Sequence, residues 1–232
     1  MAEANNVGFR VLTRIERVAA EVVAGFVTLE TTCVTDAMNR FGSLDPEVQP
    51  VVPGMRLCGP AVTVRLPPGD NLMVYKAFEL AHPGDVLVLE ARGLRTVAHW
   101  GDLTSQVAAK LGLGGMVTDG VVRDIGGIRD AGLPVFARPG FVANGGRKNG
   151  PGEVNVPVAV GGVPILPGDL VLGDDNGVVI VPRADAAAVL ARARKIAAGE
   201  EAKVREIQAG NCIPDWLAPT LARLGCEIVE HA

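Results

Sequence analysis

The chain has few aromatic residues: Phe, Trp and Tyr make up 4% of its 232 residues, although 48% are hydrophobic. Small and branched aliphatic side chains therefore dominate the apolar part, which suits closely packed strands and helices more than an aromatic-lined pocket. The chain has four cysteines and no Cys-x-x-Cys pair, so neither a zinc site nor a disulfide framework is expected. We expect the thiols to be small buried groups in a reducing cytoplasm.

Two further absences narrow the range of functions. No apolar run approaches the ~20 residues needed to span a bilayer, and residues 1–6 lack the basic and apolar regions of a signal peptide. The net charge of −4 argues against the basic surface typical of nucleic-acid binding. We therefore expect a cytoplasmic protein that binds neither membrane nor nucleic acid.

Helical and strand-like patterns alternate along the chain and indicate a layered α/β domain with a mixed sheet. Periodicity predicts helices at residues 11–25, 32–42, 102–111 and 184–209, and another that begins at Asp70-Asn71 and includes residues 72–77. Strands are predicted at residues 61–66, 86–88, 115–118, 154–160, 170–172 and 178–181. The glycine-rich stretch 140–152, which contains Lys148-Asn149, is expected to be a loop at the rim of an active site. Since no stretch resembles a linker, we expect one domain over residues 1–232.

The most informative pattern is Asp102, followed after twenty residues by the adjacent pair Arg123-Asp124. Asp102 comes directly after Gly101 at the start of a predicted helix, where exposed N–H groups favour an anion. Arg123 presents a planar fork that binds a carboxylate through two parallel hydrogen bonds. Asp124 is a hard oxygen ligand of the kind that Mg²⁺ or Mn²⁺ accepts. Together these groups could bind an acidic substrate and a divalent cation.

Each of these residues also has a structural interpretation. Asp102 could do no more than cap its own helix. Arg123-Asp124 could be an exposed ion pair with an N-cap, which would stabilise the protein little. Capping by Asp70-Asn71 explains Asn71, although a role in orienting water stays open. A hydrogen-bonded structural role explains His99, although acid–base chemistry stays open.

As a set, these motifs resemble the class II pyruvate aldolases that act on 4-hydroxy-4-methyl-2-oxoglutarate and 4-carboxy-4-hydroxy-2-oxoadipate. Their relative is the regulator of ribonuclease E activity A. The likeness covers about residues 15 to 210 and includes Thr35-Asp36-Ala37, residues 59–64, Asp70-Asn71, and residues 83–88, 134–138 and 168–183. It implies a three-layer β/β/α fold like that of the phosphohistidine swivelling domain, with a family-like core at residues 11–210 and a C-terminal extension at 211–232.

The resemblance also implies a role for each residue of the motif. Asp124 would ligate Mg²⁺ or Mn²⁺ directly, and Asp102 would act on it through water. Arg123 would hold the 2-oxo acid, whose carboxylate would receive hydrogen bonds from the backbone N–H groups of Gly101, Asp102, Leu103 and Thr104. The implied substrate is thus a small 2-oxo acid.

An assembly of several chains is implied as well. In the resembling aldolases a glutamate from the neighbouring subunit's C-terminal helix reaches the metal, and Glu200 and Glu201 are the candidates here. This implies a homotrimer or homohexamer. From the residues alone, Glu200 and Glu201 are typical of a solvated helix face, and the apolar stripe at residues 189–196 could be buried within one chain.

The implied reaction cleaves a 4-hydroxy-2-oxo acid into pyruvate and a second keto acid. Oxaloacetate decarboxylation would pass through the same pyruvate enolate. The alternative is a non-catalytic protein that binds and inhibits a ribonuclease, as the regulator relative does. A related enzyme acting on another small acidic substrate also stays open.

Overall fold

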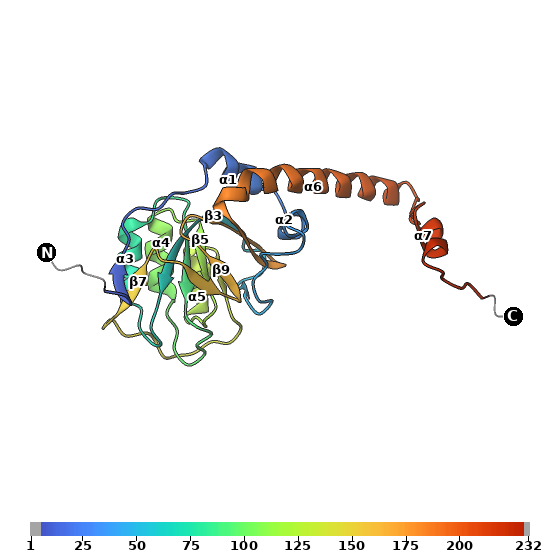
Figure 1. Cartoon of the computed structure of the whole chain (residues 1–232). Helices are drawn as coiled ribbons and strands as arrows, with labels where there is room; N and C mark the ends of the chain where they lie inside the picture. Colours follow the sequence, from blue (N-terminus) through green and yellow to red (C-terminus); the bar gives the residue numbers. More distant parts are fainter. Residues whose placement is uncertain (1–5, 230–232) are drawn as a thin grey trace.

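The computed structural model describes residues 6–229, which form a body of packed sheets and helices with a long helical arm (Figure 1). Within these residues a nine-stranded mixed sheet has the order β1-β7-β3-β4-β5-β6-β2, and β10 and β11 join it through β3. Its strands are β1 (Phe9–Val11), β2 (Gln49–Pro50), β3 (Leu57–Arg65), β4 (Val86–Glu90), β5 (Gly115–Thr118), β6 (Val135–Ala137), β7 (Gly152–Val154), β10 (Leu170–Asp174) and β11 (Gly177–Val181).

Four parallel strands, β3 to β6, form the centre of the sheet, and a helix connects each to the next. These helices are α3 (Leu72–Leu80), α4 (Asp102–Lys110) and α5 (Ile125–Ala131). All three pack on the same face, because alternate strand residues such as Leu87 and Leu89 lie in one core cluster with Phe78, Ala108 and Ile128. The predicted helix at 102–111 and strand at 115–118 are confirmed.

A second β layer covers the opposite face of the sheet. It consists of the hairpin of β8 (Val158–Val160) and β9 (Val163–Ile165), together with β10 and β11. Val86 and Val88 of β4 pack against this layer. β3 belongs to both layers, since residues 57–60 pair with β10 and residues 61–65 pair with β4. The predicted α/β fold with a mixed sheet is confirmed; the likeness to the phosphohistidine swivelling domain stays a prediction.

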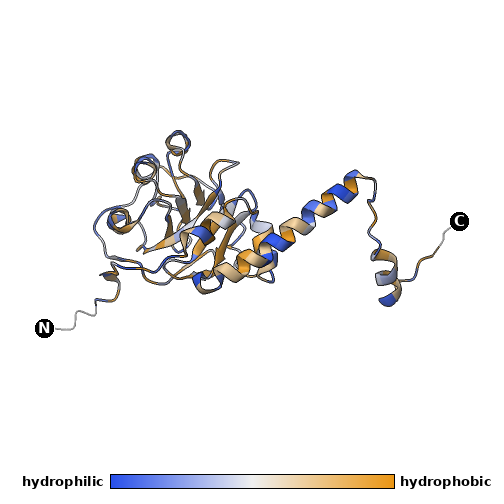
Figure 2. Ribbon diagram, turned by 90° about the horizontal axis from the view of Figure 1, so that it is seen from above, coloured by the Kyte–Doolittle hydropathy of each residue, from blue (hydrophilic) through white to orange (hydrophobic). Residues whose placement is uncertain are grey.

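Three helices from the two ends of the chain cover the outer face of β10 and β11. They are α1 (Ala20–Phe26), α2 (Thr31–Ala37) and α6 (Ala186–Gln208), which follows a 3₁₀ turn at Arg183–Asp185. The buried side chains of α6 all lie in its first turns: Ala186, Val189, Leu190 and Ala193. Beyond them the helix projects toward α7 (Leu217–Arg223), with hydrophilic and hydrophobic residues alternating along it (Figures 1 and 2). The apolar stripe is thus largely buried within the chain.

The predicted helix at residues 11–25 is wrong in its first half. Residues 12–19 have no regular secondary structure, and only α1 is helical. Leu12 donates its N–H to Val154 of β7 and accepts a hydrogen bond from the Asn155 side chain. Arg17 forms an ion pair with the buried Asp85 at 2.7 Å. These long-range bonds hold the backbone in this conformation, although the local apolar spacing favours a helix.

Two other boundaries differ from the prediction for reasons of backbone conformation. α2 ends at Ala37 instead of Gly42, because Asn39 and Arg40 adopt positive φ angles of 57° and 67° and turn the chain. The predicted strand 154–160 is divided into β7 and β8, since Asn155 has a φ of 59° that no strand continues through. The short strands β1, β2, β6 and β9 and the helix α5 were not predicted.

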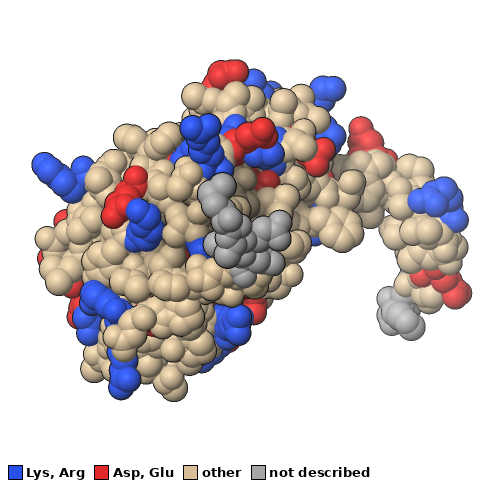
Figure 3. All heavy atoms as spheres, turned by 60° about the vertical axis from the view of Figure 1, so that its left-hand side comes forward, with Lys and Arg blue, Asp and Glu red and all other residues tan. Residues whose placement is uncertain are grey.

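Surface charge is mixed on the side of the molecule shown in Figure 3, where basic and acidic side chains alternate over the body. Within residues 6–229, no helix combines the length and apolar character that a membrane crossing requires. The described part of the chain excludes residues 1–5 and residues 230–232. The expectation of no signal segment therefore falls largely outside the described residues, as does the end of the C-terminal extension.

Candidate functional site

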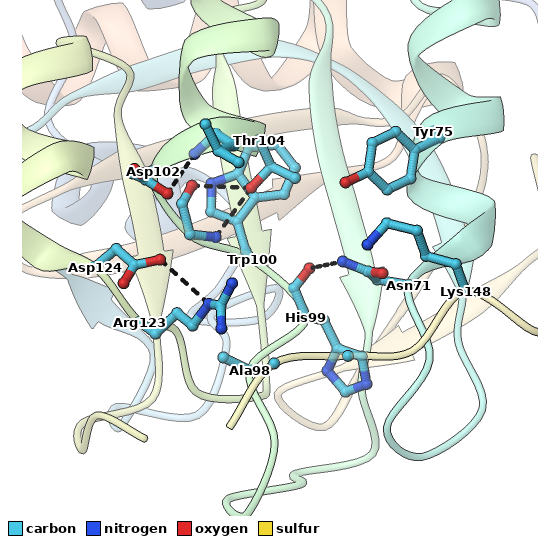
Figure 4. Close-up of a pocket in the computed structure, with 14 residues that line it drawn as sticks. Asn71, Tyr75, Ala98, His99, Trp100, Asp102, Thr104, Arg123, Asp124 and Lys148 are labelled. Atoms are coloured by element: carbon cyan, nitrogen blue, oxygen red, sulfur yellow. Dashed lines mark hydrogen bonds and ion pairs between the residues drawn. The ribbon is translucent and has the colours of Figure 1, made fainter. Parts of the chain in front are cut away.

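A cavity of about 90 Å³ opens at the edge of the sheet where the parallel strands β3, β4 and β5 end (Figure 4). The loops that follow these three strands line it, and residues 145–148 close one side. The carboxyl ends of parallel strands are where α/β proteins commonly bind ligands. The cavity is smaller than the ~300 Å³ at which drug-sized pockets begin, so it suits a small ligand.

The structure brings together all three residues of the predicted motif. Asp102 begins α4, whereas Arg123 and Asp124 follow β5, and all three line the cavity. Arg123 Nε lies 3.2 Å from Asp124 Oδ2, and each of these side chains is 42% exposed. The two carboxylates and the guanidinium therefore share one opening while remaining accessible to a ligand (Figure 4).

Glycines without side chains make this convergence possible. Three of them lie directly against the charged groups: Gly101, Gly127 and Gly145. A Cβ added to Gly101 would lie 2.7 Å from Asp124 Oδ2, and one added to Gly127 would lie 2.4 Å from Asp102 Cβ. A Cβ added to Gly145 would lie 2.6 Å from Arg123 Nη1. These distances are shorter than a normal van der Waals contact. The glycines near the motif are therefore part of the site; Gly101 was predicted for its N–H group, whereas Gly127 and Gly145 were not predicted.

Asp124 has an unusual backbone. Its φ and ψ of 59° and 48° place it in the left-handed region, which is uncommon for a residue other than glycine. Although it occupies the N-cap position of α5, its side chain makes no capping hydrogen bond, so the N-cap interpretation of its carboxylate is wrong. The ion-pair interpretation holds, since the carboxylate lies beside Arg123. Such backbone strain costs about 1–3 kcal/mol and is often found at functional sites.

The start of α4 already uses two of its N–H groups. The Thr104 hydroxyl accepts a hydrogen bond from Gly101 N–H at 2.9 Å, and it contacts the Gly101 carbonyl oxygen at the same distance. Leu103 N–H donates to Asp102 Oδ1 at 2.7 Å, so the capping interpretation of Asp102 is confirmed in part. Among the described residues, this leaves the N–H groups of Asp102 and Thr104 for a ligand.

His99 holds the loops that follow β3 and β4 together beside the cavity. Its Nε2 accepts a hydrogen bond from Gly69 N–H at 3.2 Å, and its ring points away from Arg123 and Asp124 (Figure 4). Burial lowers the pKa of His99, an effect that the Pro67 carbonyl and the Asp70 charge only partly oppose. A neutral, hydrogen-bonded imidazole agrees with the structural interpretation of this residue.

Asn71 does not cap its helix. The Asp70 carboxylate accepts the hydrogen bond from Leu72 N–H at 2.8 Å, whereas the Asn71 amide donates to the His99 carbonyl at 3.1 Å. The capping interpretation is therefore right for Asp70 and wrong for Asn71. Asn71 Oδ1 is buried and has no hydrogen-bond partner within residues 6–229. The side chain lines the cavity opposite Arg123.

Two polar side chains that line the cavity, those of Lys148 and Tyr75, were not predicted as site residues. Lys148 extends from the glycine-rich loop and lies 5.4 Å from the centre of the Tyr75 ring. Tyr75 belongs to α3 and is partly exposed. The prediction that this loop forms a rim is confirmed by Gly145, Gly146 and Lys148, which all line the cavity. The sequence does not indicate that Tyr75 lines a cavity, because its position among the apolar residues of a helix is equally typical of a buried side chain.

Glu200 and Glu201 do not lie at this cavity within one chain. They line a separate hollow between α6 and α2, where the Cys33 thiol donates to Glu200 Oε2 at 3.0 Å. In the part of the chain that the structure describes, no group of three or more His, Cys, Asp and Glu side chains could hold a metal ion. One chain alone therefore offers a cation the carboxylates of Asp102 and Asp124.

Comparison with known proteins finds similar chains that carry a provisional aldolase name and others described as ribonuclease inhibitors. A family model described as RraA-like, Aldolase/RraA, matches residues 31–180, which include the whole motif. A protein of Halalkalibacterium halodurans with the provisional name 4-hydroxy-4-methyl-2-oxoglutarate aldolase is 41% identical over 187 residues. The match covers 81% of this chain and 89% of that protein.

Two solved structures share the fold with a TM-score of 0.74 each. An uncharacterized protein from Pseudomonas syringae pv. tomato is 31% identical, with 84% of this chain and 96% of that chain covered. RraAS2 from Streptomyces coelicolor is 29% identical, with 82% and 98% covered, and is described as an unusual member of the RNase ES inhibitor RraA protein family. The likeness thus extends over most of the body but does not separate the two activities.

Proposed function

Because the chain belongs to the RraA-like Aldolase/RraA family, we propose that it is a divalent-metal-dependent class II aldolase of the cytoplasm. It cleaves a 4-hydroxy-2-oxo acid, such as 4-hydroxy-4-methyl-2-oxoglutarate or 4-carboxy-4-hydroxy-2-oxoadipate, into pyruvate and a second keto acid. It also decarboxylates oxaloacetate, because both reactions produce the same enolate. The convergence of Asp102, Arg123 and Asp124 in one small cavity carries this proposal.

The oxygen donors of the cavity suit Mg²⁺ or Mn²⁺. Mg²⁺ usually keeps several waters and needs only one or two protein carboxylates, which is what one chain offers. Asp124 would hold the ion directly and Asp102 through a water. When bound, the cation would supply the positive charge that stabilises the negative oxygen of a pyruvate enolate.

Arg123 is the residue that binds the 2-oxo acid. Its Nε is held by Asp124 at 3.2 Å, its Nη1 lies 3.4 Å from the Ala143 carbonyl oxygen, and the backbone of Gly145 lies against its guanidinium. These contacts restrict the side chain before the substrate arrives, so less conformational entropy is lost on binding. The planar fork then meets the carboxylate or the 2-oxo group of the substrate.

The N-terminus of α4 is the second anchor for the substrate carboxylate. The N–H groups of Asp102 and Thr104 lie beside the cavity at the positive end of the helix dipole. Cleavage of the C3–C4 bond requires loss of the 4-hydroxyl proton, and a water hydrogen-bonded to Asp102 takes it. The electron pair of the broken bond passes to the pyruvate fragment as an enolate, and C3 of this enolate then takes up the proton that the water at Asp102 accepted.

A homotrimer or homohexamer would complete the site with a glutamate from the α6 of the next chain. Burial and the neighbouring Glu200 carboxylate raise the pKa of Cys33 to about 11, so the thiol stays protonated and donates to Glu200. Because Glu200 is engaged by Cys33 within its own chain, Glu201 is the better candidate to reach a neighbouring site.

The decisive experiment measures pyruvate release. The full chain is assayed with 4-hydroxy-4-methyl-2-oxoglutarate, 4-carboxy-4-hydroxy-2-oxoadipate and oxaloacetate in the presence of Mg²⁺, and again after addition of a chelator. We expect turnover that the chelator abolishes and that Mg²⁺ or Mn²⁺ restores. Turnover that is indifferent to the chelator would reject the metal role, and no turnover of any of the three would reject the aldolase.

The similarity to RraAS2 favours a second function, a non-catalytic protein that binds and inhibits a ribonuclease. This function needs an interaction surface and no chemistry in the cavity. Affinity capture of a ribonuclease by the full chain, together with inhibition of its RNA cleavage and no turnover of 2-oxo acids, would establish it in place of the aldolase.

A further inference from the structure

The side of the cavity opposite Arg123 and Asp124 contains a positively charged group that the proposed reaction leaves unused. Figure 4 shows the Lys148 ammonium and the Tyr75 hydroxyl turned into the cavity from that side, with Asn71 beneath them. Lys148 lies over the Tyr75 ring at 5.4 Å, which restricts the lysine through a cation–π contact. The cavity thus has a cation at each end.

Backbone hydrogen bonds fix the loop that presents Lys148. Arg147 N–H donates to the Gly69 carbonyl and its own carbonyl accepts from Asn71 N–H, both at 2.8 Å. Gly146 N–H donates to the Ala98 carbonyl at 2.9 Å. The residues before the lysine are therefore held against the two loops that follow β3 and β4, so its position does not depend on a flexible rim.

The same loop also contacts the cation at the other end of the cavity. The Ala143 carbonyl and the Gly145 backbone lie against the guanidinium of Arg123. One short segment, residues 143–148, therefore contacts the guanidinium at one end of the cavity and carries the ammonium at the other. Two cations at opposite ends of one cavity match a substrate that carries two anionic groups.

Two polar groups on this side lack a partner within residues 6–229. Arg123 is paired with Asp124, but Lys148 has no carboxylate within ion-pair distance. Asn71 Oδ1 is buried and accepts no hydrogen bond, since the amide nitrogen of this side chain is the atom that bonds to His99. A buried acceptor without a donor is unfavourable, and a hydroxyl group of a ligand between the two cations would satisfy it.

We propose that Lys148, supported by Tyr75, binds the second carboxylate of the substrate and so selects 2-oxo acids that carry one. This inference rests on the proposed function, in which Arg123 and the start of α4 hold the 2-oxo acid end. Lys148 is here a specificity-determining binding residue. A charge-assisted hydrogen bond to a carboxylate corresponds to roughly 10- to 100-fold in affinity.

A binding experiment tests this without requiring turnover. The full chain with Mg²⁺ is titrated calorimetrically with pyruvate, which has one carboxylate, and with 2-oxoglutarate, which adds a second. We expect at least tenfold tighter binding of 2-oxoglutarate by the natural chain. Lys148→Met and Lys148→Gln should remove this preference, whereas Lys148→Arg should keep most of it. Lys148 is exposed, so these variants should keep the thermal unfolding midpoint of the natural chain.

Lys110→Met is the matched control, since it removes an exposed lysine at the far end of α4 and should leave the preference unchanged. If Lys148→Met keeps the preference, or if the natural chain shows none while binding pyruvate, the role of Lys148 is overturned and the proposed function stands. If the natural chain binds neither acid and releases no pyruvate from any 4-hydroxy-2-oxo acid, the proposed function itself is overturned.

Discussion

Asp124 combines a left-handed backbone with a carboxylate that is 42% exposed. Asp adopts this region more readily than most residues other than glycine, and the exposed Arg40 and Arg92 also have positive φ angles, so the conformation alone does not indicate a function. The backbone of Asp124 turns the chain between β5 and α5, so that Arg123 and Asp124 both face the cavity. The strain is the consequence of placing a guanidinium and a carboxylate side by side at one strand end.

Arg123→Lys should reduce kcat/KM on the order of 100-fold, because a point charge cannot reproduce two parallel hydrogen bonds to a carboxylate. The measurement is steady-state pyruvate release with Mg²⁺. Arg129→Lys is the matched control: Arg129 is exposed on α5, away from the cavity lining, and its replacement should change kcat/KM less than twofold. Retention of full activity by Arg123→Lys would contradict the bidentate role.

At the scale of elements, the cavity depends on how closely α4 and α5 approach each other. α4 brings Asp102, and α5 meets it with a backbone that has no side chain at Gly127. Gly126, its neighbour on the same helix, has nothing within 4 Å of an added Cβ. Both glycines lower the helix propensity of α5, but only Gly127 lies so close to Asp102 that a side chain would not fit. A comparison of the two positions therefore distinguishes the close contact from the effect on helix propensity.

Gly127→Ala should reduce pyruvate release at least tenfold, because the new methyl group would displace Asp102 or push α5 away from α4. Gly126→Ala should keep activity and raise the unfolding free energy by up to about 1 kcal/mol through improved helix propensity. Steady-state kinetics and chemical denaturation of both variants provide the comparison. Equal effects of the two substitutions would show that the contact with Asp102 is unimportant.

On the scale of the whole molecule, the later turns of α6 bury no side chain against the body of their own chain. The first turns of this helix are buried against β10 and β11, whereas its later turns extend past the body with Glu200 and Glu201 (Figure 1). Isolated helices depend on packing for most of their stability. A projecting helix is therefore expected to pack on another copy of the chain, which agrees with the proposed assembly.

We expect light scattering to give the mass of three or six chains of 24.1 kDa each. Within this assembly, Glu201→Gln should weaken Mg²⁺ activation by at least tenfold, since it removes an anionic ligand from the neighbouring site. Glu200→Gln should have a much smaller effect, because Glu200 is bonded to Cys33. Mg²⁺ titrations of activity distinguish the two. A monomer with full activity, or the reverse order of effects, would refute this arrangement.

Local periodicity predicted α3, α4, the parallel strands β3, β4 and β5, and α6, because in these segments the apolar spacing and the tertiary burial agree. The pattern of Asp102 and Arg123-Asp124 predicted three of the residues that line the cavity. These residues lie at the ends of α4 and β5, two elements that the local pattern predicts. The predictions were wrong at residues 12–19, which are not helical, and at Asn155, which interrupts the predicted strand. Their conformations depend on hydrogen bonds to distant strands that no local pattern records.

The chain's own order of residues determined the layered α/β fold and the charged motif of Asp102 and Arg123-Asp124. Only the tertiary structure decided which side chains complete the cavity. Lys148 and Tyr75 are far apart in sequence and meet because the loop after β6 returns to the end of β3. The physical reason is that backbone hydrogen bonds between loops depend on distance in space, which periodicity within an element does not encode.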